Sequence, residues 1–294
     1  AAAVSGANGS WLLDPNNISI VAGAGASTNI TGNPSFLSND DNAQIYDTTI
    51  NTALDAGNDV TVTTGTGGAN GQAGVITVSG AISNSTGGAR TLTLTAAGAI
   101  SVTGSIEGTS GNALSVVLDA PTGSVAINGG IDTWGGALTI NAGGAVTQTA
   151  AVASGAGTLP LILNLTGSAT ANLTTAGNYF FEITLNSTST GSINIATATT
   201  PQLQTSSIAG DLTLTAPTSG FIQSGALTAT GGGTVTIDGG SGNVTLSQAN
   251  AFSGNLFVTA NQITTSAAQT FTLAGPSTLS LVSAGGISVG GDIA

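Results

Sequence analysis

The sequence predicts an all-β protein that folds as a single-stranded parallel β-helix, or β-solenoid, with about 23 residues and three short strands per coil. Two observations lead to this fold class. One phrase, in which two aliphatic residues flank a single residue and precede small polar ones, recurs at nearly constant spacing. Within each run, apolar residues alternate with Thr, Ser or Asn, as in a strand with one buried face, and no stretch has a sustained helical period.

The first sixty residues differ from the rest of the chain and form the first of two predicted regions. Residues 1–60 hold two prolines and a group of aspartates that includes Asp14, Asp40 and Asp55. We expect a strand over 11–20, a polar loop through Asn42, and a segment over 45–54 that can hold one helical turn. This region is an N-terminal, cap-like lead-in to the repeats.

The second region, residues 61–294, is predicted to be one continuous solenoid. Its first coil is lengthened by a Gly-rich loop over 65–74, and an irregular interval between Leu185 and Leu214 predicts an insertion near 196–207. A single coil cannot bury its inner face alone, whereas stacked coils bury a continuous aliphatic column. A β-sandwich of seven or eight strands also has frequent turns, but it gives no reason for anchors at a constant period. The second aliphatic residue of the phrase stands at positions 94, 118, 140, 163, 214, 237, 258 and 281.

The N-terminal third resembles a family of large exoproteins. The phrase Trp11-Leu12-Leu13-Asp14-Pro15-Asn16-Asn17-Ile18-Ser19-Ile20 is similar to one in the two-partner-secreted filamentous haemagglutinins and high-molecular-weight adhesins of Gram-negative bacteria. The resemblance continues through residues 50–62, 74–78 and 92–100, and so covers about residues 10–106. Beyond this range the chain shares only the general solenoid repeat.

This resemblance implies a right-handed helix, an extracellular or cell-surface location and a role in adhesion to host cells, other bacteria or surfaces. It also implies export by an outer-membrane β-barrel partner, through a secretion domain that we expect upstream of Ala1. The receptor, a glycan or a protein, is not identified. The family is also associated with haem use, but without His, Met or Cys only Tyr46 or Tyr179 remains as an axial ligand, so we predict no cofactor.

Composition excludes several classes of function. The chain has 13 acidic residues against one basic residue, Arg90, for a formal net charge of −12. Without His, Cys or Lys it cannot form a Ser-His-Asp triad, a thiolate nucleophile, a Schiff base or an ordinary zinc site. Its charge disfavours nucleic acid and anionic membrane surfaces. No apolar run approaches the ~18 residues of a membrane-spanning helix, so we predict no membrane insertion.

Two acidic segments resemble metal sites. Asn39-Asp40-Asp41-Asn42 is the densest acidic cluster; we interpret it as a solvated loop, with a weak Ca²⁺ site as the alternative. The segment Asp238–Asn243 is interpreted as a Gly-rich corner, because a Ca²⁺-binding nonapeptide needs Asp where Val244 stands and no tandem copy follows. We therefore predict no catalytic and no metal-binding residue.

The rare aromatic residues are the candidate contact patch, because aromatic side chains provide much of the energy at interfaces. We expect Trp11 to be packed at the N-terminal end of the column. Trp134 falls at a turn, and of Tyr179-Phe180-Phe181 we expect one or two rings to face inward. Eight Asn-x-Ser/Thr sequons also occur, which is close to the number that this composition gives by chance; they begin at Asn8, Asn17, Asn29, Asn84, Asn164, Asn172, Asn186 and Asn243.

Three functions remain open at this point. The favoured one is a non-catalytic shaft of a secreted or cell-surface adhesin, with binding sites on loops such as 27–44, 64–74 and 196–207. The first alternative is the repeating subunit of an extracellular filament, a homo-oligomer assembled end to end through unpaired strand edges. The second alternative, a polysaccharide-active β-helix enzyme, requires carboxylates gathered on one face, whereas Asp119, Asp132, Asp211 and Asp238 are scattered.

Overall fold

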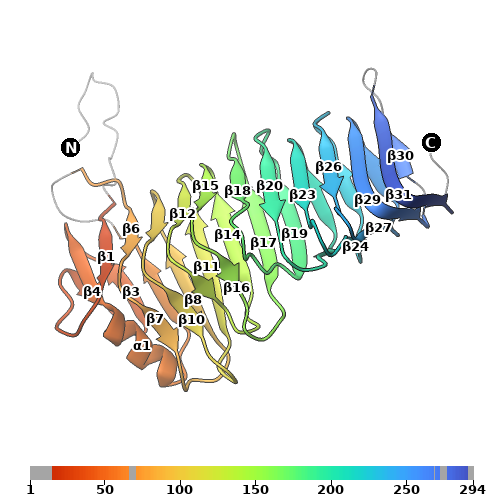
Figure 1. Cartoon of the computed structure of the whole chain (residues 1–294). Coiled ribbons are helices and arrows are strands. Elements are labelled where there is room, and N and C mark those ends of the chain that lie inside the picture. Colours follow the sequence, from red (N-terminus) through yellow and green to blue (C-terminus); the bar gives the residue numbers. More distant parts are fainter. Residues whose placement is uncertain (1–14, 66–70, 268, 272–276, 291–294) are drawn as a thin grey trace, which may run out of the picture.

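The computed structural model describes residues 15–65, 71–267, 269–271 and 277–290. It is a β-solenoid of about eleven turns with about 23 residues per turn, drawn in Figure 1 as an elongated stack of strands. The predicted fold class is confirmed. Trp11, Asp14 and the first part of the strand predicted over 11–20 lie outside the described residues.

Two long sheets run the length of the stack, and almost all of their strand pairs are parallel. In order along the stack, the first sheet contains β4 (Ala43–Tyr46), β1 (Ile18–Val21), β6 (Ile76–Val78), β9 (Ile100–Val102), β12 (Val125–Ile127), β15 (Val146–Gln148), β18 (Ala171–Leu173), β20 (Ile193–Ala196), β23 (Leu212–Thr215), β26 (Val235–Asp238) and β29 (Leu256–Thr265), with β27 (Asn243–Leu246) and β31 (Leu279–Val289) both paired to β29.

The second sheet contains β2 (Ile30–Thr31), β3 (Ser35–Ser38), β5 (Val60–Thr63), β8 (Arg90–Thr95), β11 (Leu114–Ala120), β14 (Leu138–Ala142), β17 (Pro160–Leu165), β19 (Glu182–Ser187), β22 (Ser206–Ile208), β25 (Leu227–Ala229), β28 (Asn250–Phe252) and β30 (Gln269–Phe271). Two further short strands extend it at one side: β21 (Gln202–Leu203) pairs with β19, and β24 (Ile222–Gln223) pairs with β21.

A third, shorter sheet closes the N-terminal half of the coils. It consists of β7 (Ile82–Asn84), β10 (Ile106–Gly108), β13 (Ile131–Asp132) and β16 (Val152–Ala153). The next coil has no strand on this side: residues 174–181 connect β18 directly to β19. This interruption is where the groove described in the next section lies.

Alternation within each strand produces the core. Leu94, Leu118, Ile140, Leu163 and Leu185 stand opposite one another on successive strands of the second sheet and are fully buried. Their polar neighbours face outward, where Asn141, Asn164 and Asn186 form an amide ladder, each donating to the preceding residue of the ladder, which starts at Asp119. Truncating one such buried aliphatic residue to Ala costs about 2–5 kcal/mol.

The N-terminal end of the stack is closed by elements that do not continue the repeat. Helix α1 (Asp47–Asp55) buries Ile50, Ala53 and Leu54, which lie on one face at i, i+3 and i+4, and packs beside β7. Strands β2 and β3 form an antiparallel hairpin at the edge of the second sheet. The predicted helical turn within 45–54 is therefore a helix of nine residues.

The segment 196–207 differs from the predicted insertion. It holds the end of β20, all of β21 and the start of β22, and the coil there is short, because Ile193 pairs with Leu212 nineteen residues later. The recurring phrase changes sheets at this point. Its copies from Leu92 to Leu185 lie in the second sheet, whereas those that begin at Leu212, Val235, Leu256 and Leu279 lie in the first.

Candidate binding surface

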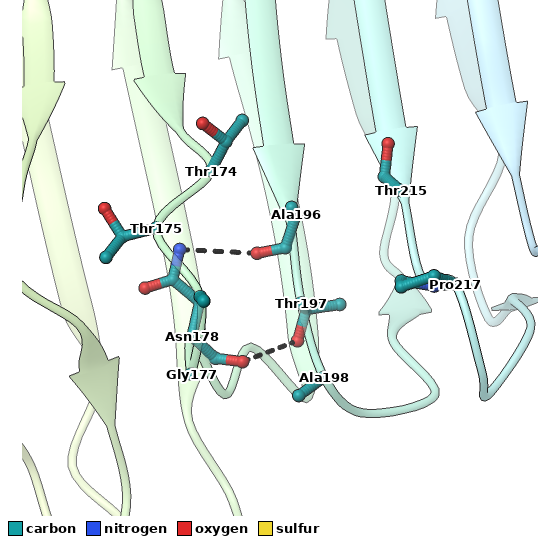
Figure 2. Close-up of a pocket in the computed structure, with 10 residues that line it drawn as sticks. Thr174, Thr175, Gly177, Asn178, Ala196, Thr197, Ala198, Thr215 and Pro217 are labelled. Carbon is teal, nitrogen blue, oxygen red and sulfur yellow. Dashed lines mark hydrogen bonds between the residues drawn. The ribbon is translucent and has the colours of Figure 1, made fainter.

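One groove among the described residues lies where the third sheet is interrupted. Its volume is about 310 Å³, and its walls come from three successive coils. Figure 2 shows Thr174, Ala196 and Thr215 at equivalent places on neighbouring strands, with Pro217 beyond them. None of the residues that line it carries a charge; they are threonine, alanine, glycine, asparagine and proline.

Asn178 holds the floor of this groove together. Its side chain is completely buried and donates to the carbonyl oxygens of Leu173, at 3.0 Å, and Ala196, at 3.3 Å. Its amide oxygen accepts hydrogen bonds from the backbone N–H of Val152, at 3.0 Å, and from the side chain of Gln148. Asn178 therefore ties together three coils where strand pairing is missing (Figure 2 draws its bond to Ala196).

Trp134 occupies a strained turn between β13 and β14. Its φ of 47° lies in the left-handed region, and the Asp132 carboxylate stabilises the turn by accepting hydrogen bonds from the backbone N–H groups of Trp134, at 3.1 Å, and Gly155, at 2.9 Å. A Cβ added to Gly155 would stand 2.5 Å from Cε2 of the indole. The half-buried ring thus lies directly on Gly155 of the next coil.

The run Tyr179-Phe180-Phe181 divides between core and surface. Phe180 is fully buried, whereas Tyr179 and Phe181 are half-buried, so one ring faces inward as the alternation predicts. Tyr179 continues the line of the third sheet, because its backbone N–H donates to the carbonyl of Val152 at 2.9 Å. Its hydroxyl lies 3.9 Å from where a Cβ of Gly157 would stand.

The structure brings two of the four predicted contact residues to one turn. Trp134 and Tyr179 come from coils on either side of the turn that contains Gly155 and Gly157, and each lies against one of these glycines. Phe180 belongs to the core. A contact role for Trp134, Tyr179 and Phe181 stays a prediction.

Several acidic residues accept backbone N–H groups of their own turn or of the next coil. Asp40 accepts the N–H of Asp41 at 2.8 Å. In the loop 39–42, predicted to be solvated, Asp41 is buried and the other three residues are exposed. Asp211 accepts the N–H of Thr234 at 2.7 Å, and Asp238 that of Gly240 at 2.9 Å. Among the described residues, no three acidic side chains gather closely enough to hold a metal ion.

Sequence reasoning missed the side chains that hold the structure together at its corners. Asn84, Asn178 and Asn250 are buried and each bonds to more than one coil. From the sequence alone they are indistinguishable from ordinary turn residues, because no local pattern separates a buried asparagine at a corner from a solvated one. Asn84 also begins a sequon.

Comparison with known families gives a match in the second half of the chain. Residues 188–259 match a family described as repeats of unknown function (DUF5649). The matched range begins immediately after β19 and ends within β29. No curated protein and no solved structure matches the chain. Within the described ranges, no helix has the length and hydropathy of a membrane span.

Proposed function

We propose that this chain is a non-catalytic shaft segment of a secreted or cell-surface adhesin, exported by an outer-membrane β-barrel partner of its parent protein. The observation that carries the proposal is the uninterrupted apolar column through about eleven stacked turns. Such a column gives a stiff, extended body whose outer surface is free to vary. At about 4.8 Å per turn it extends roughly 50 Å.

The surface chemistry supports the same proposal. The carboxylates of Asp119, Asp132, Asp211 and Asp238 each accept hydrogen bonds within or between neighbouring coils. They stabilise the fold locally and are not paired across a cleft, as a glycoside-cleaving pair would be. The groove at the interruption of the third sheet has no titratable group.

The filament alternative is less well supported. Head-to-tail stacking would place the C-terminal face of one rod on the N-terminal face of another. At the N-terminal face, however, α1, the β2–β3 hairpin and an antiparallel bridge between Thr28 and Gln44 of β4 stand where the next coil would pair.

Because the chain has no lysine, it can be attached to beads in one orientation, and adhesion can be tested with such beads. Because Arg90 is the one basic side chain, amine-reactive biotin labels only the N-terminal amine, and streptavidin beads then carry all rods in one orientation. We expect the beads to be retained on epithelial or bacterial layers under flow, and we expect no reducing ends to be released from a panel of polysaccharides. The proposal is wrong if folded rods give no retention on any of these layers, or if reducing ends appear.

A further inference from the structure

We propose that the corner formed by Trp134, Gly155, Gly157 and Tyr179 binds an uncharged glycan chain that lies along the axis of the rod. This inference rests on the proposed adhesive function and names its ligand class. It starts from the positions of two aromatic rings on a molecule whose aromatic residues make up only 4% of the sequence.

Backbone groups anchor both residues, and packing on Gly155 fixes the indole of Trp134. Trp134 keeps its left-handed turn through the Asp132 carboxylate, and its indole rests on Gly155, where any side chain would collide with it. Tyr179 is anchored by its own N–H on Val152 and extends its hydroxyl toward Gly157. The indole of Trp134 is thus held by packing before any ligand binds, which lowers the entropic cost of binding.

The polar groups of both rings, the indole N–H and the phenol hydroxyl, are available to a ligand. A buried Trp or Tyr usually satisfies its N–H or O–H with a protein partner. Here both side chains are half-buried, and neither the indole N–H of Trp134 nor the hydroxyl of Tyr179 makes a hydrogen bond to a described residue. Each offers a ring for the C–H face of a sugar and a donor for its hydroxyl groups.

The positions of the two aromatic residues and the charge of the chain indicate the class of glycan. The backbones of Trp134 and Tyr179 stand about 10 Å apart along the axis, on the coils before and after the turn of Gly155 and Gly157, and both side chains reach toward that turn. The net charge of −12 repels sulfated or sialylated chains, and the Asp132 carboxylate beside Trp134 adds to this repulsion locally. These features together favour a neutral glycan.

The experiment follows the fluorescence of Trp134 in a Trp11→Phe background, which leaves it as the single indole of the chain. Neutral hexasaccharides with glucose, N-acetylglucosamine, mannose or galactose repeats are titrated separately, beside a heparin hexasaccharide. We expect at least one neutral series to change the emission and to bind more tightly as hexasaccharide than as disaccharide. Tyr179→Ala should weaken this binding about tenfold or more, and Tyr179→Phe should weaken it less.

Tyr46→Phe is the matched control, because the ring of Tyr46 packs near Gly23 and Gly25 at the far end of the rod; it should bind like the parent. The inference is overturned if no neutral series responds, if heparin is the preferred ligand, or if Tyr179→Ala binds unchanged. Bead retention without any glycan response would sink this inference and leave the adhesive function standing. A glycan response without bead retention would support this inference and contradict the adhesive function.

Discussion

At the scale of single residues, polar side chains form the hydrogen bonds that connect coils at corners, where strands do not pair. Asn250 shows this most clearly: it is buried, its amide donates to Gln223 and Gln269, and its oxygen accepts the N–H of Leu227 at 2.7 Å. A buried amide with all its partners stabilises the structure, whereas one without them costs ~1–3 kcal/mol. We therefore interpret Asn84, Asn178 and Asn250 as determinants of the fold and not as sites of modification.

Asp55 gives a prediction about pH. Burial raises the pKa of this carboxyl, but hydrogen bonds from the N–H and hydroxyl groups of Ser85 and Thr86 together outweigh burial and hold the pKa below its usual value of 3.8. Asp55 thus stabilises the folded chain above that value, and its contribution is lost as the pH falls through the lowered pKa. Urea unfolding should show Asp55→Asn as less stable than the parent near neutral pH, with the gap narrowing from about pH 5 to about pH 2.

The control for this prediction is Asp40→Asn, which removes the same charge from an exposed residue whose carboxylate bonds to the neighbouring N–H of Asp41. Its stability gap should be smaller at neutral pH. A gap for Asp55→Asn that stays constant over the whole range would show that the ionised carboxylate contributes nothing specific.

At the scale of elements, α1 replaces a strand at the edge of the third sheet. Its side chains at i, i+4 and i+8, which are Asp47, Asn51 and Asp55, accept the N–H groups of Ala81, Ser83 and Ser85 along the edge of β7. Four helical residues rise about 6 Å and two strand residues about 6.6 Å. The two spacings are close enough for a helix to satisfy every second N–H of a strand edge.

Asn51 is the residue that tests this arrangement, because it bonds to both kinds of backbone group. It accepts the N–H of Ser83 at 2.9 Å and donates to the carbonyl of Ala81 at 3.0 Å. Asn51→Ala should cost about 1–3 kcal/mol and speed hydrogen exchange at the Ser83 amide. Thr52→Ala, which changes an exposed hydroxyl bonded within the helix, should leave that amide protected. Equal exchange in both variants would contradict the capping role.

The elements also show how far the sequence can predict this fold. Period and alternation predict the solenoid, its coil length and the inward residues, because these depend on one repeated pattern. They do not predict which sheet a strand joins: Leu92-Thr93-Leu94 and Leu212-Thr213-Leu214 have the same alternation but lie in different sheets. The switch depends on the short coil after Ile193, which the sequence presents as part of a longer interval. The Trp134–Tyr179 corner was predicted only as separate residues, since the glycines that bring them together have no distinctive pattern.

At the scale of the whole molecule, the two ends of the column differ. At the N-terminal end Ile18, Ile20 and Ile45 are fully buried. At the other end, three residues of β31 are exposed: Leu279 by 38%, Ile287 by 47% and Val289 by 50%. Their partners on β29 are all buried. An exposed apolar strand edge favours further pairing, either with a following coil of a longer chain or with another copy, and this asymmetry limits what pairing between copies can build.

Self-association of residues 1–294 by themselves should therefore stop at two copies. An open face can meet a second open face about a two-fold axis, but a third rod would have to dock on a face that α1, the β2–β3 hairpin and β4 already cover. Sedimentation equilibrium should show monomer and dimer with no longer species. The double variant Leu281→Lys, Ile287→Lys should abolish the dimer, because it places charge on the inward side of β31. The control Ser280→Lys places charge on the outward side, one residue away, and should leave the dimer intact. Filaments of many rods would mean that the N-terminal cap opens or is displaced, since that face would then have to accept the open end of another rod.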